Sequence, residues 1–217
     1  HYSAKGREEF RLRHGLAEKF VVMYSGNHSP CHPLDTLLDA ARVLHDRPEL
    51  IFCFIGGGSE HVKVRELATH LSNVKCLPYQ PLNELSNSLS AADLDVVVMG
   101  DEFVGIVHPC KVYNILAVGG PALYIGPEPS HVTDIASHHG TFFRTRHGEV
   151  EAVVAAILEA RQAHSRNPVR SFSKQTLLPE LIALIEAGQE YRGADPVQGR
   201  RPTRSEIDAP SLGGKSL

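Results

Sequence analysis

The fold of this chain is decided by residues 94–125, which read LDVVVMGDEFVGIVHPCKVYNILAVGGPALYI. The segment opens with an unbroken apolar run, 94–99, that is typical of a strand buried on both faces. Pro109 suits the first position of a helix, because its missing N–H costs nothing there. Gly119-Gly120-Pro121 is a strong stop signal for that helix, and a second apolar run follows at 122–125. The segment therefore predicts a strand, a loop, a helix and a further strand.

The same alternation extends along the chain in both directions. The expected strands are 20–25, 50–55, 74–77, 94–99, 122–125 and 140–143. The expected helices are 33–45, a segment ending near 71, 83–91, a segment from 109, 131–136, 149–163 and 172–187. Alternating helices and unbroken apolar strands predict an α/β fold, a Rossmann-like doubly wound parallel sheet of about six strands.

We expect this domain to span residues 20–190. Residues 1–19 are expected to form an interdomain linker that carries a charged helix. Residues 191–217 are rich in Gly, Pro, Arg and Ser, which predicts a disordered tail. The chain starts without methionine, so we expect it to be a fragment of a longer protein.

Composition excludes several classes of protein. The 217 residues are 42% hydrophobic and 22% charged, which is ordinary for a globular protein, and the net charge of −3 gives no electrostatic case for binding nucleic acid. The apolar runs are too short to cross a bilayer and the polar start is no signal peptide, so we expect a cytoplasmic location. The four cysteines form no C-x-x-C pair, and Cys31-His32 lacks a second ligand pair, so we expect reduced thiols and no metal site.

A ligand of a doubly wound sheet binds beyond the carboxyl ends of the strands, at the point where the strand order reverses. The informative loops are therefore 25–32, 56–60, 78–82, 99–109 and 126–131. Glycines in these loops expose backbone N–H groups to a phosphate or sugar, although each loop alone is equally consistent with a plain turn. Lys111 and Asn114 lie three residues apart near a helix start, a suitable place to hold a phosphate. No loop carries G-x-G-x-x-G, which removes the main support for a dinucleotide oxidoreductase.

The order of these motifs resembles the carboxy-terminal donor-binding domain of GT-B glycosyltransferases, particularly the GT4-type group. The matching stretches, in order, are SGN, IGGGSE, NVKCLPYQPLNELSNSLSAADLDVVV and DEFVGIVHPCKVYNILAVGGP. The last is similar to the pattern P-[SC]-K-x-Y-x-x-L-A-x-G-x-P of enzymes that build bacterial surface polysaccharides and glycolipids. The resemblance covers residues 20–190. It implies a nucleotide-sugar donor, transfer without metal or other cofactor, and a saccharide, lipid-linked or small-molecule acceptor.

The resemblance also implies the site residues, with two departures from the family pattern. The donor-binding candidates are Gly26, Asn27, His28, His32, Gly57, Gly58, Tyr79, Gln80, Gly105, Lys111 and Asn114. Asn114 stands where the family has a second glutamate that bonds the ribose. Glu102 is the candidate catalytic residue in place of the first glutamate, although its spacing from Asn114 is longer than the family norm. The usual basic residue after the first glycine loop is replaced by His32, so Lys111 is expected to supply the positive charge.

Such enzymes bind the acceptor with an amino-terminal domain, and this chain begins where the linker between the domains would be. On this interpretation the chain alone is an inactive donor half, and the full-length protein associates peripherally with the inner face of the membrane. Two alternatives stay open: a sugar-nucleotide epimerase of the same architecture, and a non-catalytic Rossmann-like nucleotide-binding module, which Asn114 favours. The sequence does not identify the nucleotide base, the sugar, the acceptor or the oligomeric state. It also does not show whether transfer retains or inverts the configuration of the anomeric carbon.

Overall fold

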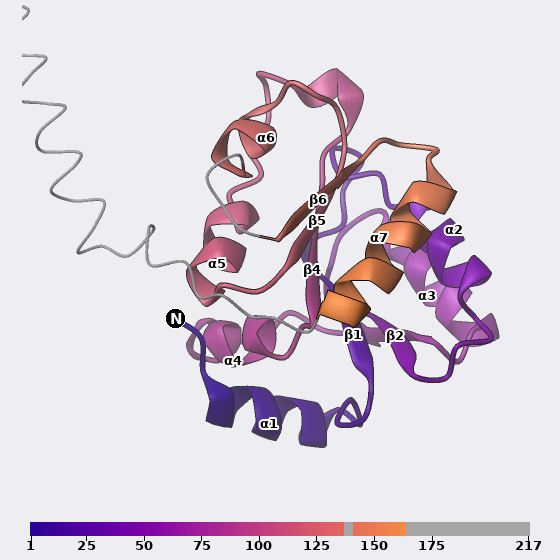
Figure 1. Ribbon diagram of the computed structural model, residues 1–217, viewed down its shortest axis with the longest axis vertical. Coiled ribbons are helices and arrows are strands. Elements are labelled where there is room, and N and C mark those ends of the chain that lie inside the picture. The colour runs from indigo at the N-terminus through magenta and orange to yellow at the C-terminus, as the bar shows by residue number, and fades with distance from the viewer. Residues whose placement is uncertain (137–140, 164–217) are drawn as a thin grey trace, which may run out of the picture. The chain divides into compact units, whose positions relative to one another are not determined.

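The computed structural model describes residues 1–136 and 141–163 (Figure 1). Six parallel strands form one sheet in the order β3-β2-β1-β4-β5-β6. The strands are β1 (Phe20–Asn27), β2 (Leu50–Gly57), β3 (Val74–Leu77), β4 (Leu94–Val98), β5 (Ala122–Ile125) and β6 (Phe142–Thr145). The helices are α1 (Ala4–Arg13), α2 (Asp35–Val43), α3 (His61–His70), α4 (Leu85–Ser90), α5 (Lys111–Val118), α6 (His131–Ala136) and α7 (Val150–Ala163), with short 3-10 helices η1 (Leu82–Glu84) and η2 (Asp101–Phe103).

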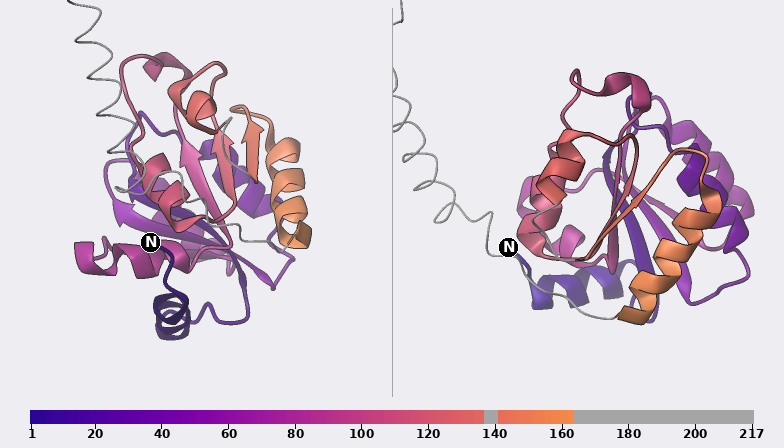
Figure 2. Two further views of the ribbon diagram at one scale, coloured as in Figure 1. Left: turned by 60° about the vertical axis from the view of Figure 1, so that its left-hand side comes forward. Right: turned by 45° about the horizontal axis from the view of Figure 1, so that its top comes forward.

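Helices cover both faces of the sheet. α2, α3 and α7 lie on one face, and α1, α4, α5 and α6 lie on the other (Figures 1 and 2). Side chains alternate along each strand, so that Val22 and Tyr24 of β1 point to the α2 and α7 side, and Val21 and Met23 point to the α1 side. The expected doubly wound α/β fold is therefore confirmed.

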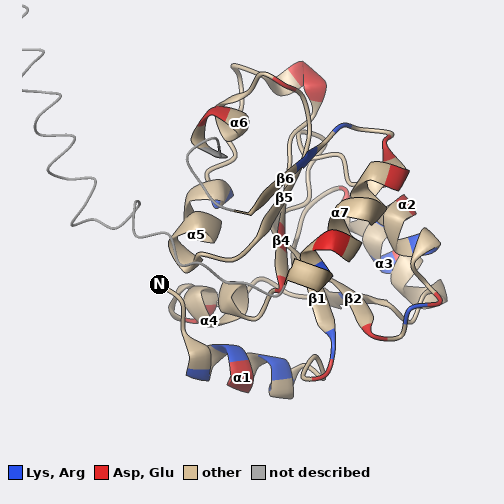
Figure 3. Cartoon of the chain, viewed as in Figure 1, with Lys and Arg blue, Asp and Glu red and all other residues tan. Residues whose placement is uncertain are grey.

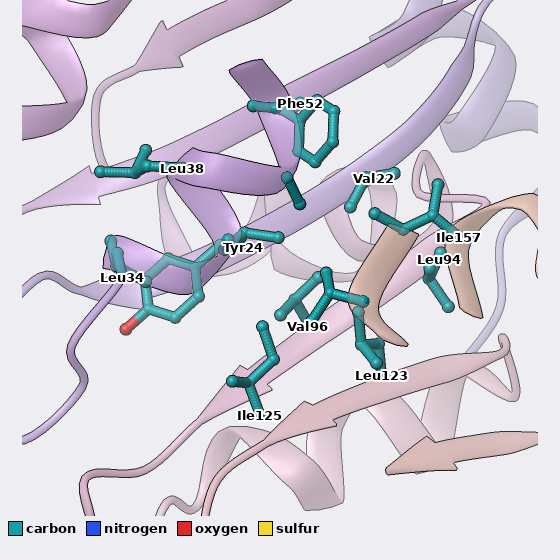
Figure 4. Close-up of a cluster of buried hydrophobic side chains, with 14 of the residues drawn as sticks. Val22, Tyr24, Leu34, Leu38, Phe52, Leu94, Val96, Leu123, Ile125 and Ile157 are labelled. Carbon is teal, nitrogen blue, oxygen red and sulfur yellow. The ribbon is translucent and has the colours of Figure 1, made fainter. Parts of the chain in front are cut away.

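The largest core cluster lies between the sheet and α2, α3 and α7. Figure 4 shows apolar side chains of the central strands meeting Leu34 and Leu38 near α2 and Ile157 of α7. Phe52 and Val96 from the strands are fully buried there. Burial on both faces explains why the strands are continuous apolar runs rather than alternating ones.

Element boundaries differ from the expected ones mainly near glycine and proline. β1 and β2 each extend two residues past the expected ends, because Gly26 pairs with Gly56 and Asn27 with Gly57 in the ladder. The helix expected to start at Pro109 starts at Lys111, since two hydrogen bonds of 3-10 spacing form the preceding turn. The expected helix 172–187 and tail 191–217 lie outside the described residues.

The expected charged helix within residues 1–19 is present as α1, and it packs on the domain (Figure 3). Phe10 and Leu16 are fully buried, and Arg7 and Arg11 form ion pairs with Asp93, which directly precedes β4. This segment therefore contributes to the core. That it also connects to another domain stays a prediction.

Candidate functional site

The candidate site lies at the carboxyl ends of the strands. The strand order reverses between β1 and β4, so the switch point of the sheet is the crevice beyond these two strands. The loop after β1 begins at His28, and the loop after β4 leads to α5, whose first residue is Lys111. The structure brings Gly26 and His28 close to Lys111 at this place.

Lys111 crosses from α5 to the end of β1. Its Nζ lies 3.6 Å from the centroid of the Tyr24 ring, and a Cβ added to Gly26 would lie 3.3 Å from the same atom. Although the residue as a whole is partly exposed, its Nζ is buried and has no hydrogen-bond partner in the described part of the chain. Burial lowers the pKa of Lys111 to about 7. A buried amine with no counterion is suited to receive an anion.

Two imidazoles with unpartnered buried nitrogens, His28 and His61, pack against each other at the end of β1 near the Lys111 amine. His28 is completely buried, and neither of its ring nitrogens finds a partner among residues 1–136 and 141–163. Its ring packs against Tyr24 at 5.0 Å and His61 at 4.7 Å between centroids. Burial, followed by the nearby His61 and Lys111, lowers the pKa of His28 to about 4. His28 is therefore neutral at pH 7, with one protonated ring nitrogen.

His32 is held by the backbone at the end of β4. Its Nδ1–H donates to the carbonyl oxygen of Val98 at 2.8 Å, which fixes the neutral tautomer because a carbonyl only accepts. Burial, followed by the charge of Lys111, lowers the pKa of His32. In this neutral form Nε2 carries a lone pair, so His32 is a weak substitute for the basic residue of the family pattern.

The two glycine loops fit against each other without room for side chains. A Cβ on Gly56 would lie 2.0 Å from the carbonyl oxygen of Gly26, and one on Gly58 would lie 2.3 Å from that of His28. Gly26, Gly56 and Gly58 all have positive φ angles. The His28 N–H donates to the Gly57 carbonyl at 2.8 Å, and His28 in turn accepts from the Glu60 N–H at 3.0 Å. These contacts form a rigid backbone floor for the site.

Tyr79 lies over this floor. Its hydroxyl donates to the Gly57 carbonyl at 3.1 Å, and its ring atoms would be 3.2 and 3.4 Å from Cβ atoms on Gly56 and Gly57. The residue is still 59% exposed, which leaves much of the ring open to a stacking partner. The adjacent Gln80 instead donates to the Pro78 carbonyl of its own loop.

The remaining predicted residues lie on exposed parts of the loops. Glu102 is exposed in η2 and lines a hollow of about 500 Å³ that also includes Pro33, Thr36 and His147. Asn27 next to Gly58, Gly105 in the loop before α5, and Asn114 within α5 are exposed as well. Their roles toward a ligand stay predictions.

Sequence reasoning missed three residues at the site: Tyr24, Gly56 and His61. Tyr24 is read from the sequence as a core strand residue, and His61 as the start of a polar helix. Only the pairing of β1 with β2 puts Gly56 opposite Gly26 and brings His61 to His28. The triple glycine was a signal for Gly56, but it did not distinguish this glycine from its neighbours.

The described residues contain neither a cluster of metal-binding side chains nor a membrane-spanning helix. No group of three or more His, Cys, Asp and Glu side chains there could hold a metal ion. None of the helices described is long and apolar enough to cross a membrane.

Residues 6–170 match the family described as glycosyl transferases group 1. The chain belongs to this family. It is also 31% identical over 168 residues to WcaI of Escherichia coli (strain K12), whose name assigns it to colanic acid biosynthesis as a glycosyl transferase. That match covers 76% of this chain but only 41% of WcaI.

Solved structures of glycosyltransferases share the fold of this family member. HepE of Anabaena, in complex with UDP, superposes with a TM-score of 0.65 at 17% identity, over 89% of this chain and 54% of HepE. WaaG, a glycosyltransferase involved in lipopolysaccharide biosynthesis, gives a TM-score of 0.62 at 20% identity, over 84% of this chain and 51% of WaaG. The chain therefore spans about half the length of these proteins, and at such identities the likeness shows the fold alone.

Proposed function

We propose that this chain is the donor-binding half of a glycosyltransferase and holds the diphosphate of a nucleotide-sugar at the switch point. The observation that carries the proposal is the buried, unpartnered Nζ of Lys111 beside the glycine loops after β1 and β2. Backbone N–H groups, a neutral His28 and one ammonium make a cradle for phosphate. Membership of the glycosyl transferases group 1 family supports this assignment.

Each part of the donor has a candidate partner. Lys111 would neutralise the charge that develops on the diphosphate as the bond from the sugar to its phosphate oxygen breaks. Tyr79 offers an exposed ring over Gly56 and Gly57 for the base, and Asn114 would accept or donate to the ribose less strongly than a glutamate. Glu102 is proposed to contact the sugar. HepE has been solved with UDP and with UDP-glucose, which makes uridine nucleotides the first ligands to try.

The acceptor half of the reaction is proposed to lie on another domain. The chain spans 41% of WcaI and 54% of HepE, which leaves room in such proteins for a second domain that binds a saccharide or lipid-linked acceptor. Transfer needs both substrates held together, so we expect no turnover from this chain alone. Turnover at the rate of a two-domain protein would contradict this part of the proposal. A non-catalytic nucleotide-binding module remains the second candidate, because Asn114 stands where the family has a glutamate.

Calorimetry with UDP, GDP and ADP tests the donor site. We expect at least one of them to bind, with an affinity that EDTA leaves unchanged because Lys111 supplies the positive charge in place of a metal ion. The Lys111→Ala variant should lose about 1–3 kcal/mol of diphosphate binding, the scale of a charge-assisted hydrogen bond, and little of nucleoside binding. Lys63→Ala is the matched control, since Lys63 pairs with Glu60 on the surface.

Absence of binding by all three nucleotides, or loss of binding in EDTA, would overturn the proposal. Equal weakening of nucleoside and diphosphate by Lys111→Ala would assign Lys111 a structural role instead.

A further inference from the structure

We infer that binding of a nucleoside diphosphate at the switch point takes up one proton, and that Lys111 receives it. This inference rests on the proposed function and adds a pH dependence to it.

The Lys111 amine is buried without any group that compensates a positive charge. Across residues 1–136 and 141–163, its Nζ forms neither a hydrogen bond nor an ion pair. The contact that stabilises its charge is the Tyr24 ring face at 3.6 Å. Burying an ammonium this way is unfavourable, and such a group tends to release its proton. Burial accordingly lowers the pKa of Lys111 to about 7, so about half of the empty chains hold a neutral amine at neutral pH.

The titratable groups around Lys111 do not offset its burial. The groups in contact or in charge interaction with it among the described residues are Tyr24 of β1, His28 after β1 and His32 before α2. The charge of Lys111 lowers the pKa of both His28 and His32, which shows that these rings face it as neutral neighbours. Asp101 and Glu102 are exposed. Within residues 1–136 and 141–163, no fixed anion therefore compensates the charge of the Lys111 amine.

A diphosphate in this crevice would favour the charged form of Lys111 over the neutral form. Its negative charge favours the ammonium form and raises the pKa of Lys111, so complex formation draws a proton from solvent. Nucleotide binding is therefore strongest below the pKa of Lys111 in the free chain, and it weakens as the pH rises from that value toward the higher pKa of the complex.

Calorimetry in two buffers of different ionisation enthalpy measures this proton. At pH 8, in HEPES and in Tris, UDP binding to the wild-type chain should take up about one proton per nucleotide, since few empty chains are protonated at Lys111 there. Between pH 7 and pH 8.5 the Kd should rise about tenfold. GDP and ADP are used in the same way if UDP does not bind.

The Lys111→Arg variant is the matched control. Arginine keeps its charge at every pH used, so we expect binding without proton uptake and a Kd that changes less than about twofold over the same range. Proton uptake that persists in Lys111→Arg would assign the proton to His28 or His32 and overturn the inference.

NMR of the lysine side chains in the nucleotide-free wild-type chain gives a second test that needs no variant to bind. One lysine signal, absent from Lys111→Arg, should titrate near pH 7, whereas surface lysines titrate near their ordinary value of about 10.4. A Lys111 signal that titrates with the surface lysines, or UDP binding without proton uptake in the wild type, would overturn the inference while leaving the proposed function intact. Absence of any nucleotide binding would overturn both.

Discussion

Gly56 is the residue at which the site tolerates least change. Its φ is +133°, and a Cβ there would lie 2.0 Å from a backbone oxygen of Gly26. We therefore expect Gly56→Ala to destabilise the chain by about 3 kcal/mol or more, because backbone strain and overpacking add. It should also abolish nucleotide binding, since the floor of the site would shift. Urea unfolding and calorimetry measure the two effects.

Gly15→Ala is the control for Gly56→Ala. Gly15 also has a positive φ, +64°, but nothing lies within 4 Å of an added Cβ. It should cost only about 1 kcal/mol, the strain of the backbone conformation alone, and leave nucleotide binding unchanged. If the two variants lose the same stability and Gly56→Ala still binds UDP, the close approach of Gly56 to Gly26 is not required for nucleotide binding.

Some residues of the candidate site can be predicted from the sequence and others cannot. Lys111 and Gly58 could be named from motif order alone, because a lysine at a helix start and a glycine after a strand have local meanings. Tyr24 and His61 could not, because their importance depends on contacts with Lys111 and His28, which come from other elements. The low pKa of Lys111 has the same origin, since it results from burial by side chains distant in sequence.

α1 is the element whose attachment depends most on charge. Asp93 forms ion pairs with Arg7 and Arg11 of α1, and it also accepts a hydrogen bond from the Val21 N–H at the start of β1. Burial by itself would raise the pKa of Asp93, but the two guanidinium groups outweigh it and hold the pKa below the usual range. Asp93→Asn leaves the buried Arg11 and the partly buried Arg7 without their anion, and we expect a loss of about 3 kcal/mol in the free energy of unfolding.

The pH dependence of stability checks the same pair. Because the folded-state pKa of Asp93 is lowered, its contribution is complete above the ordinary value of 3.8 and is lost as the pH falls through the folded-state pKa. Urea unfolding from pH 7 to pH 3 should therefore show a smaller acid dependence for Asp93→Asn than for the wild type. Asp46→Asn is the control, since Asp46 is 86% exposed and pairs with the exposed His45. Equal losses from both variants would show that Asp93 does not hold α1.

Elements were predicted well where their signals are local. β3 and β5 have the expected bounds because turn-forming residues flank both short strands, Asn73 and Pro78 for β3 and Pro121 and Gly126 for β5. The docking of α1 could not be predicted, because the helix pairs with a carboxylate about 80 residues away and has little apolar character of its own. The extra residues of β1 and β2 depend on backbone pairing between glycines, which side-chain patterns do not record.

The sheet and its helices follow from the alternation of strands and helices, which also predicts the edge of the sheet that carries the site but not the two strands that flank it. Alternation predicts a parallel sheet with helices on both faces, whereas the order β3-β2-β1-β4-β5-β6 comes from strand pairing. That order puts the switch point between β1 and β4, where Lys111 meets Tyr24. The Lys111 amine, which has no partner among the described residues, lies at this edge of the sheet.

A crystal structure of this chain with UDP, or with whichever of GDP and ADP binds in calorimetry, tests the central claim most directly. We predict that the diphosphate lies beyond the carboxyl ends of β1 and β4, with a phosphate oxygen within hydrogen-bond distance of the Lys111 Nζ and others facing the glycine loops. A nucleotide bound at the opposite edge of the sheet, or bound at this edge with the Lys111 amine still over Tyr24 and no phosphate contact, would contradict the account.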